Sequence, residues 1–339
     1  MEVQQDLLSQ FLEPGMMFLD PSKRVFWGSL LGSLLLIVLL SGKSRLANLE
    51  KLFSRQIWWH KSSQADMKII VINSLLRTVL IPGSWISAAA IAALISWSLT
   101  KLWGGKPELT WSPLVVMTLY SITMFVVDDF ARFFLHYLQH RWRFLWHFHQ
   151  VHHSALVLTP LTLYRTHPVD IIAARLRNAL AYGCVTGVFF FYFGATVSGW
   201  DILGADALGF LFNLAGSNLR HSQVWIHFGP FESILISPAA HQVHHSDDPL
   251  HYDKNFGVCL SLWDRLWQTH FDPRNCDKEL SFGVRDSPLS SPEQKIWTMY
   301  WHPFQQFFAK NETKTHAELE LEEAGRPDEL LELDPKATV

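Results

Sequence analysis

The stretch LTWSPLVVMTLYSITMFVVDDFARFFLHYLQH, residues 109–140, joins an uncharged apolar run to a pair of histidines. Its first part, Leu109–Val127, holds no Asp, Glu, Lys or Arg, and a helix of this length can cross a hydrocarbon core about 30 Å thick. Nothing between Pro113 and His140 breaks a helix. We therefore expect one long helix that crosses a membrane and continues beyond it.

Three further runs contain no charged residue, and they cover Val25–Gly42, Thr78–Thr100 and Asn178–Trp200. The chain of 339 residues is 49% apolar and only 17% charged, whereas average soluble domains are about one quarter charged. This composition excludes an ordinary soluble enzyme and a disordered chain. It predicts an all-α, polytopic integral membrane protein with four or five transmembrane helices.

The distribution of basic residues predicts the topology. A first crossing at Val25–Leu40 precedes the Lys- and Arg-rich segment Gly42–Lys68, which should be cytoplasmic and would leave the N-terminus outside. The second crossing is expected at Val79–Trp97 and the fourth at Ala179–Val197, after the long helix. Ile202–Ser217 is either a fifth crossing or a re-entrant hairpin. No nucleic-acid-binding face is indicated.

Seventeen histidines are present, where a chain of this size would hold about seven. His136 and His140 are four residues apart, so they share one face of the long helix. The sequence HQVHHS occurs twice, at residues 149–154 and 241–246. Together these motifs supply eight box histidines, namely His136, His140, His149, His152, His153, His241, His244 and His245. Eight exceed what one ion can take, so two metals are predicted.

The nature of the metal is not fixed by the boxes, because imidazole binds iron, copper and zinc alike. The three cysteines are far apart and form no C-x-x-C pair, so neither a disulfide framework nor a thiolate metal site is indicated. A scaffold without enzymatic activity would be expected to have lost ligands, and none of the three boxes has lost one.

The combination of one H-x3-H box and two H-x2-H-H boxes resembles the fatty acid hydroxylase and sterol desaturase superfamily of membrane di-iron oxygenases. The resemblance covers roughly Leu114–Phe271. It extends to several shorter motifs, which are Asp129-Phe130, Arg165-Thr166-His167-Pro168, Leu219-Arg220-His221-Ser222, Ser237-Pro238, Asn255-Phe256-Gly257 and Trp263-Asp264-Arg265-Leu266. This chain departs from the family pattern at Phe133-Phe134, where a Tyr-Trp pair is frequent, at His147, and at Gln268-Thr269.

The resemblance implies that the eight box histidines and His221 coordinate two irons, with dioxygen as co-substrate. It also brings in His167 and Asn255 as residues that support the ligands or face the substrate. His227 lies six residues after His221, off its helical face, and is either a ligand or an interfacial histidine beside Trp225.

Asp129 lies two helical turns before His136, where its carboxylate could accept a ring N–H and fix the tautomer of a ligand, and Asp128 is the alternative. His147 is expected to be solvated. The histidines without ligand spacing are His60, His251, His270, His302 and His316.

Three regions follow from these assignments. Residues 1–110 form an N-terminal transmembrane region, and residues 111–305 form the catalytic domain that resembles the family. The histidines of this domain should lie in a cytoplasmic cap made by Asp128–Arg177 and His221–Trp301. Residues 306–339 form an acidic, solvated tail.

The predicted activity is the iron- and oxygen-dependent hydroxylation of an apolar lipid. A desaturase with the same site and a di-zinc membrane hydrolase are the alternatives. The chain has no cytochrome b5-like His-Pro-Gly-Gly, no nucleotide-binding G-x-G-x-x-G and too few cysteines for an iron–sulfur cluster. A separate cytochrome b5-like or ferredoxin-like carrier, with its reductase, should therefore dock on a basic face of the cap. That face would contain Arg132, Arg141, Arg143, Arg175, Arg177 and Lys254.

Overall fold

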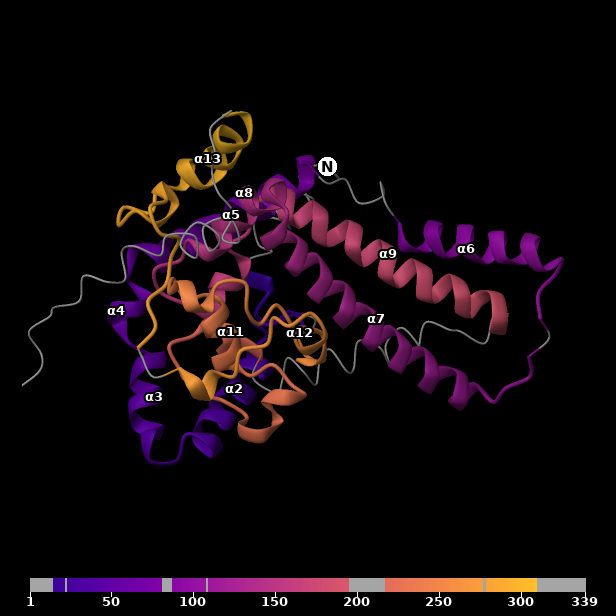
Figure 1. Ribbon diagram of the computed structural model, residues 1–339, viewed down its shortest axis with the longest axis horizontal. Coiled ribbons are helices and arrows are strands. Elements are labelled where there is room, and N and C mark those ends of the chain that lie inside the picture. The colour runs from indigo at the N-terminus through magenta and orange to yellow at the C-terminus, as the bar shows by residue number, and fades with distance from the viewer. Residues whose placement is uncertain are drawn as a thin grey trace, which may run out of the picture.

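The computed structural model describes residues 15–21, 23–80, 87–107, 109–194, 217–276 and 279–309, apart from the side chains of residues 43 and 77–80. The regular secondary structure of this part is helical, and only two isolated β-bridges occur in it. The all-α prediction is thereby confirmed for the described residues. Figure 1 shows two regions, an elongated arm of helices and a cap of helices and loops.

The arm consists of α6 (Ala88–Trp103), α7 (Pro113–Arg141) and α9 (Pro168–Phe193), which extend together to the right of the cap (Figure 1). The predicted long helix is confirmed, because α7 runs unbroken for 29 residues. Ser112 caps it by accepting a hydrogen bond from the Val115 amide at 3.4 Å, and Pro113 occupies its first turn. Among the described helices, α7 is the one that is long and apolar enough to cross a membrane.

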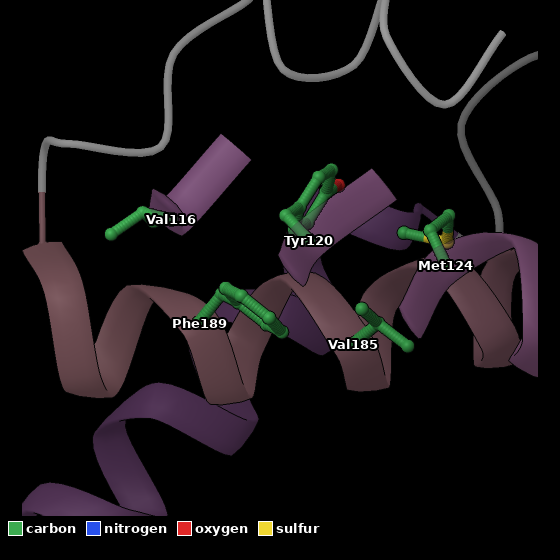
Figure 2. Close-up of a cluster of buried hydrophobic side chains, with 5 residues drawn as sticks. All are labelled: Val116, Tyr120, Met124, Val185 and Phe189. Atoms are coloured by element: carbon green, nitrogen blue, oxygen red, sulfur yellow. The ribbon is translucent and has the colours of Figure 1, made fainter. Parts of the chain in front are cut away.

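Apolar side chains and close glycine contacts hold the arm together. Figure 2 shows Val116, Tyr120 and Met124 of α7 facing Val185 and Phe189 of α9. The α6–α9 contact depends on two glycines of α9. A Cβ at Gly183 would lie 2.6 Å from Ile91 Cβ, and one at Gly187 would lie 2.7 Å from the Ala92 carbonyl oxygen. Small residues allow the two backbones to approach this closely, as is common between helices in membranes.

The remaining described helices form the cap, which in the structure also contains residues 27–80, outside the expected ranges Asp128–Arg177 and His221–Trp301. Figure 1 shows these helices grouped to the left of the arm. They are α2 (Trp27–Leu40), α3 (Arg45–Leu52), α4 (Arg55–Trp58), α5 (Lys61–Leu80), α8 (Arg143–His153), α11 (Pro238–His244), α12 (Leu262–Leu266) and α13 (Ile296–Phe308). Its 3-10 turns are η1 (Gly42–Ser44), η2 (Pro160–Tyr164), η4 (Ser217–His221), η5 (Gly229–Ser233), η6 (Pro249–His251), η7 (Pro273–Asn275) and η8 (Pro288–Ser290). One of its cores joins α5, α8 and α13 through Ile69, Val151 and Met299.

Two of the expected crossings are placed differently. The second was expected at Val79–Trp97, but α5 continues to Leu80 and α6 occupies Ala88–Trp103. The charge-free run is thus divided between two helices. The first was expected at Val25–Leu40, where α2 covers Trp27–Leu40 and packs on α3 and η4 of the cap. The expected segment Ile202–Ser217 and the tail 306–339 lie largely outside the described residues.

A buried ion pair links the elements around the second histidine box. The Arg165 guanidinium is fully buried and donates to Asp66 Oδ1 of α5 at 2.9 Å, to the Val151 carbonyl at 3.0 Å and to Ser154 Oγ at 2.9 Å. Asp66 also accepts the Thr162 hydroxyl at 2.7 Å. Because each buried charge has several partners, α5, α8 and η2 are held in one arrangement.

We predict that Asp66→Asn lowers the free energy of unfolding by about 3–5 kcal/mol, because it leaves the buried Arg165 without its counter-charge. Unfolding of the purified protein in detergent, followed by tryptophan fluorescence, measures this change. The control is Arg274→Ala, which removes the exposed pair with Asp272 and should leave the unfolding midpoint unchanged. Equal effects of the two substitutions would contradict the role given to the buried pair.

Candidate metal centre

Eight histidines converge in two groups of four, and within each group the donor nitrogens lie within 4.8 Å of one another. The first quartet consists of His136 and His140 of α7, His153 of α8 and His244 of α11. The second quartet consists of His152 of α8, His221 of η4, and His241 and His245 at the end of α11. Seven of the eight side chains are buried, and His136 is half-buried.

The nitrogens of the second quartet are too close to be satisfied by hydrogen bonds alone. His221 Nε2 lies 3.3 Å from His152 Nε2, 3.1 Å from His245 Nε2 and 3.1 Å from His241 Nε2. A ring nitrogen has either one proton or one lone pair, so these contacts cannot all be hydrogen bonds. Imidazoles bound to a common ion at about 2.0–2.1 Å have nitrogens roughly 3.0–3.4 Å apart. The geometry therefore fits a cation shared by the four rings.

The first quartet shows the same closeness, since His140 Nε2 lies 3.1 Å from His153 Nε2. Backbone carbonyls hold the opposite side of several rings. His136 Nδ1 lies 2.9 Å from the Phe256 carbonyl, His244 Nδ1 lies 2.7 Å from that of Lys254, and His152 Nδ1 lies 3.3 Å from that of Arg165. A carbonyl can only accept, so Nδ1 carries the proton and Nε2 keeps the lone pair that binds a metal.

Burial keeps these histidines neutral. It lowers the pKa of His149 to about 3. Burial also lowers the pKa of six further histidines well below 6.5, and neighbouring imidazoles lower it more. These six residues are His152, His153, His221, His241, His244 and His245. Since neutral imidazole is the form that coordinates a metal, the site is prepared for metal binding at neutral pH.

His149 belongs to neither quartet but lies against both. Its ring centroid is 5.1 Å from those of His136, His140 and His153, and 5.5 Å from that of His152. Its Nε2 is buried and has no hydrogen-bond partner among the described residues. An orphaned buried nitrogen beside four imidazoles is suited to complete the coordination of an ion.

Two buried carboxylates that the sequence did not single out contact the box histidines. Asp170 of α9 lies 3.8 Å from His149 Nδ1 and accepts a hydrogen bond from the Gln139 amide at 2.9 Å. Asp253 lies 3.5 Å from His140 Nδ1, and Arg141 approaches its other oxygen at 3.2 Å. Neither acid has a helical spacing to the histidine it contacts, so no local pattern could have indicated it.

Asp129 was expected to contact a ring N–H, and the structure corrects this prediction. Its carboxylate accepts the Cys259 amide at 2.8 Å, the Leu260 amide at 3.1 Å and the Trp263 indole N–H at 2.9 Å. The alternative, Asp128, pairs with Arg132 and Arg177. The physical reason is that the loop after Phe256 lies against α7, and its backbone donors take the carboxylate.

Asn255 shapes the loop whose Lys254 and Phe256 carbonyls contact His244 and His136. It is fully buried with φ +56°, and its amide donates to the Ala240 carbonyl at 3.0 Å and the Phe271 carbonyl at 2.9 Å. Asp264 holds the next turn by accepting the Phe256 amide at 2.8 Å and the Gly257 amide at 2.7 Å. Asn255 and Asp264 therefore position the carbonyls that orient His244 and His136.

The other histidines lie outside the quartets. His167 caps α9 by accepting the Val169 amide at 3.2 Å, and its Nε2 donates to the Tyr300 carbonyl at 3.2 Å. His227 is exposed and accepts the Gly229 amide. His147 was expected to be solvated, but it is only 3% exposed because α13 packs on α8. Of the histidines without ligand spacing, His60, His251, His270 and His302 join neither quartet, and His316 is not described.

We predict that the purified, iron-loaded protein holds two metal ions per chain and that His241→Ala holds about one or fewer, because each quartet supplies one ion's nitrogen donors. Elemental analysis against protein concentration measures the ratio. His227→Ala is the matched control, since this histidine is exposed and outside both quartets, and it should retain both ions. A ratio of one for the unmodified protein, unchanged in His241→Ala, would contradict the dinuclear centre.

Asp170→Ala should weaken metal retention by about 10- to 100-fold, because it removes the carboxylate beside His149 Nδ1. Competition with a chelator of known affinity measures this loss. Asp128→Ala serves as the control, because that carboxylate pairs only with arginines in the described structure. Retention that is equal in both variants would show that Asp170 does not orient a ligand.

Comparison with known proteins places the centre in a family. The fatty acid hydroxylase family matches residues 121–269, a segment that contains all eight quartet histidines. An ornithine lipid hydroxylase from Rhizobium tropici is 26% identical over 242 residues, covering 70% of this chain and 67% of that protein. Human alkylglycerol monooxygenase is 27% identical over 187 residues, covering 52% of this chain and 37% of that protein.

A very-long-chain aldehyde decarbonylase from Oryza sativa is 23% identical over 239 residues, which are 68% of this chain and 82% of that protein. No solved structure matches the chain. The chain thus spans about two thirds of the first relative and little more than a third of the second. Residues 121–269 match the fatty acid hydroxylase family, and this match together with the names of the relatives indicates an oxidoreductase.

Proposed function

We propose that the protein is a membrane-embedded, di-iron lipid hydroxylase that uses dioxygen. The observation that carries this proposal is the pair of adjacent imidazole quartets. Consecutive histidines serve different quartets, His152 and His153 on α8 and His244 and His245 on α11. The rings of His153 and His245 stack with centroids 4.5 Å apart, so the two sites are direct neighbours.

Iron is favoured over zinc because the family is one of oxidoreductases, and zinc has no redox chemistry. Iron ions bound in both quartets would supply, with dioxygen as co-substrate, the oxidising power to attack an unactivated C–H bond. The chain's own residues hold neutral imidazoles in fixed tautomers through the Phe256, Lys254 and Arg165 carbonyls. The rings of Trp146 and Phe256, each 5.0 Å from that of His140, help to exclude water.

The placement of the centre on α7 supports a lipid substrate. His136 lies nine residues beyond Val127, where the uncharged run of α7 ends, which is about 13 Å along the helix. An acyl chain that leaves the bilayer at this point could reach the centre without crossing bulk water. The relatives named for ornithine lipid and alkylglycerol point to the same class, a lipid with a long hydrocarbon chain and a polar head.

An external carrier must supply the electrons in this proposal. Its expected basic docking face is weaker than the sequence indicated, because Arg132 and Arg177 both pair with Asp128 and Arg141 pairs with Asp253. Three of the six basic side chains therefore share two carboxylates, which offset part of their positive charge. The carrier should rely less on charge than expected, and raised salt should slow turnover only modestly.

We expect one labelled oxygen atom in the lipid product when the iron-loaded protein turns over with ¹⁸O₂ and a reducing carrier. Mass spectrometry of the extracted lipid measures the label. An unlabelled alkene would indicate a desaturase, and oxygen taken from water would indicate a hydrolase. Without a carrier, product should not exceed about one per di-metal centre, since each turnover consumes two electrons. Sustained turnover with a nicotinamide alone would contradict the need for a carrier.

A further inference from the structure

Helix α2 lies along the cap with both ends attached to it. At the N-terminal end, Val25 packs with Ile70 of α5, next to Tyr164 of η2. At the C-terminal end, Ile37 packs with Leu219 of η4 and with Val224. Figure 1 shows α2 among the cap elements near α3 and α11, away from the arm. A helix fixed to the cap at both ends does not lead away from it across a membrane.

The opposite face of α2 is apolar and exposed. Trp27, Leu31, Leu35 and Leu39 recur every four residues and are 55%, 55%, 58% and 63% exposed. The helix has 14 residues, about 21 Å, which is shorter than a hydrocarbon core about 30 Å thick. Four large side chains in one exposed row are not expected in contact with water, because a large apolar patch marks an interaction surface.

The exposed apolar surface continues toward the arm through two short elements. Phe228 packs on the cluster that contains Ile37, and η5 begins at the next residue. Phe231 of η5 is 62% exposed, and Ile234, which follows η5, is 54% exposed. The Ser261 amide donates to the Ile234 carbonyl at 2.9 Å, which joins this segment to α12. In α12, Leu262 is 46% and Leu266 is 61% exposed.

The same surface meets α7 where its uncharged run ends. Trp263 of α12 contacts Phe130 of α7 with ring centroids 5.0 Å apart, and Phe130 lies three residues beyond Val127. If α7 crosses the bilayer, this contact is level with the membrane surface. Lys23 precedes α2 and the exposed Arg45 follows it, as is typical of a helix that lies in the interface with basic groups toward the lipid head groups.

We infer that α2 lies in the plane of the bilayer and does not cross it. Together with η5, Ile234 and α12 it forms an apolar surface, here called the apolar collar, that inserts into the lipid leaflet next to the histidine centre. The collar consists of Trp27, Leu31, Leu35, Leu39, Phe231, Ile234, Leu262 and Leu266. This inference rests on the membrane placement of α7 proposed above, and it is independent of the reaction. It replaces the expected first crossing, and it puts the residues on both sides of α2 on the same side of the membrane as the histidines.

Cysteine labelling tests the topology. In a background with the three native cysteines replaced by serine, Lys23→Cys and Ser44→Cys flank α2, Glu293→Cys marks the cap and Lys106→Cys marks the tip of the arm. A membrane-impermeant maleimide applied to sealed vesicles should label the first three from one side and Lys106→Cys from the other. Labelling of Lys23→Cys and Ser44→Cys from opposite sides would overturn the inference. Lys106→Cys on the side of Glu293→Cys would contradict the span of α7, and no turnover is needed for either result.

A nitroxide attached at Leu35→Cys tests what covers the exposed face. In phosphatidylcholine vesicles, lipid-soluble oxygen should increase the relaxation rate of the nitroxide spin much more than a water-soluble nickel chelate does. The control is a nitroxide at Glu50→Cys on the exposed surface of α3, which should respond to the nickel chelate. Access of the nickel chelate to the nitroxide at Leu35→Cys would overturn the lipid contact. Protection from both reagents would also overturn it, because a second protein copy on this face would exclude oxygen and chelate alike. Unchanged iron content in these variants confirms that the cap is intact.

Discussion

The closeness of the histidine nitrogens is the constraint on which the rest of the structure depends. Four Nε2 atoms at 3.1–3.3 Å cannot all be paired by hydrogen bonds, and burial has removed the water that would otherwise solvate them. A cation at their centre would satisfy all four nitrogens at once. Helices α7, α8 and α11 and the turn η4 each bring part of the set, and the buried Arg165–Asp66 pair fixes α8 against α5. The stability of the cap and the affinity for metal are therefore linked.

Helix α7 carries both the apolar run that is long enough to cross a membrane and two of the quartet histidines. The first half of α7 is uncharged and packs with α9 through apolar side chains, and its last turns carry His136 and His140. The apolar run and these two histidines lie in one continuous helix, without a linker between them. A hydrocarbon chain near the end of the uncharged run would be held at a constant distance from the centre, which favours attack at a defined carbon. The apolar collar would add a second fixed contact with the leaflet, so that the whole cap would stay in register with the bilayer.

Local sequence patterns indicated most of the histidines that come together in the fold, but not the contacts that support them. The spacings of His136 with His140 and of the two HQVHHS motifs follow helical periodicity, so they place rings on common faces of α7, α8 and α11. The partners of these rings come from distant segments. The carbonyl of Phe256 is 120 residues from His136, and Asp170 is 21 residues from His149 without any periodic relation. Asp129 was misassigned because a loop that approaches from residues 259–263 takes its carboxylate. Hydropathy alone also could not indicate that α2 packs on the cap, because this helix has no charged residue and its packing on η4 depends on distant residues.

X-ray absorption at the iron edge of the loaded protein tests the central claim most directly, because it reports the atoms bound to the metal. The account predicts a first shell dominated by nitrogen at about 2.1 Å, the multiple-scattering pattern of several imidazoles per iron, and a second iron as a heavy neighbour. A first shell made mainly of carboxylate or water oxygens, with no imidazole scattering, would contradict it.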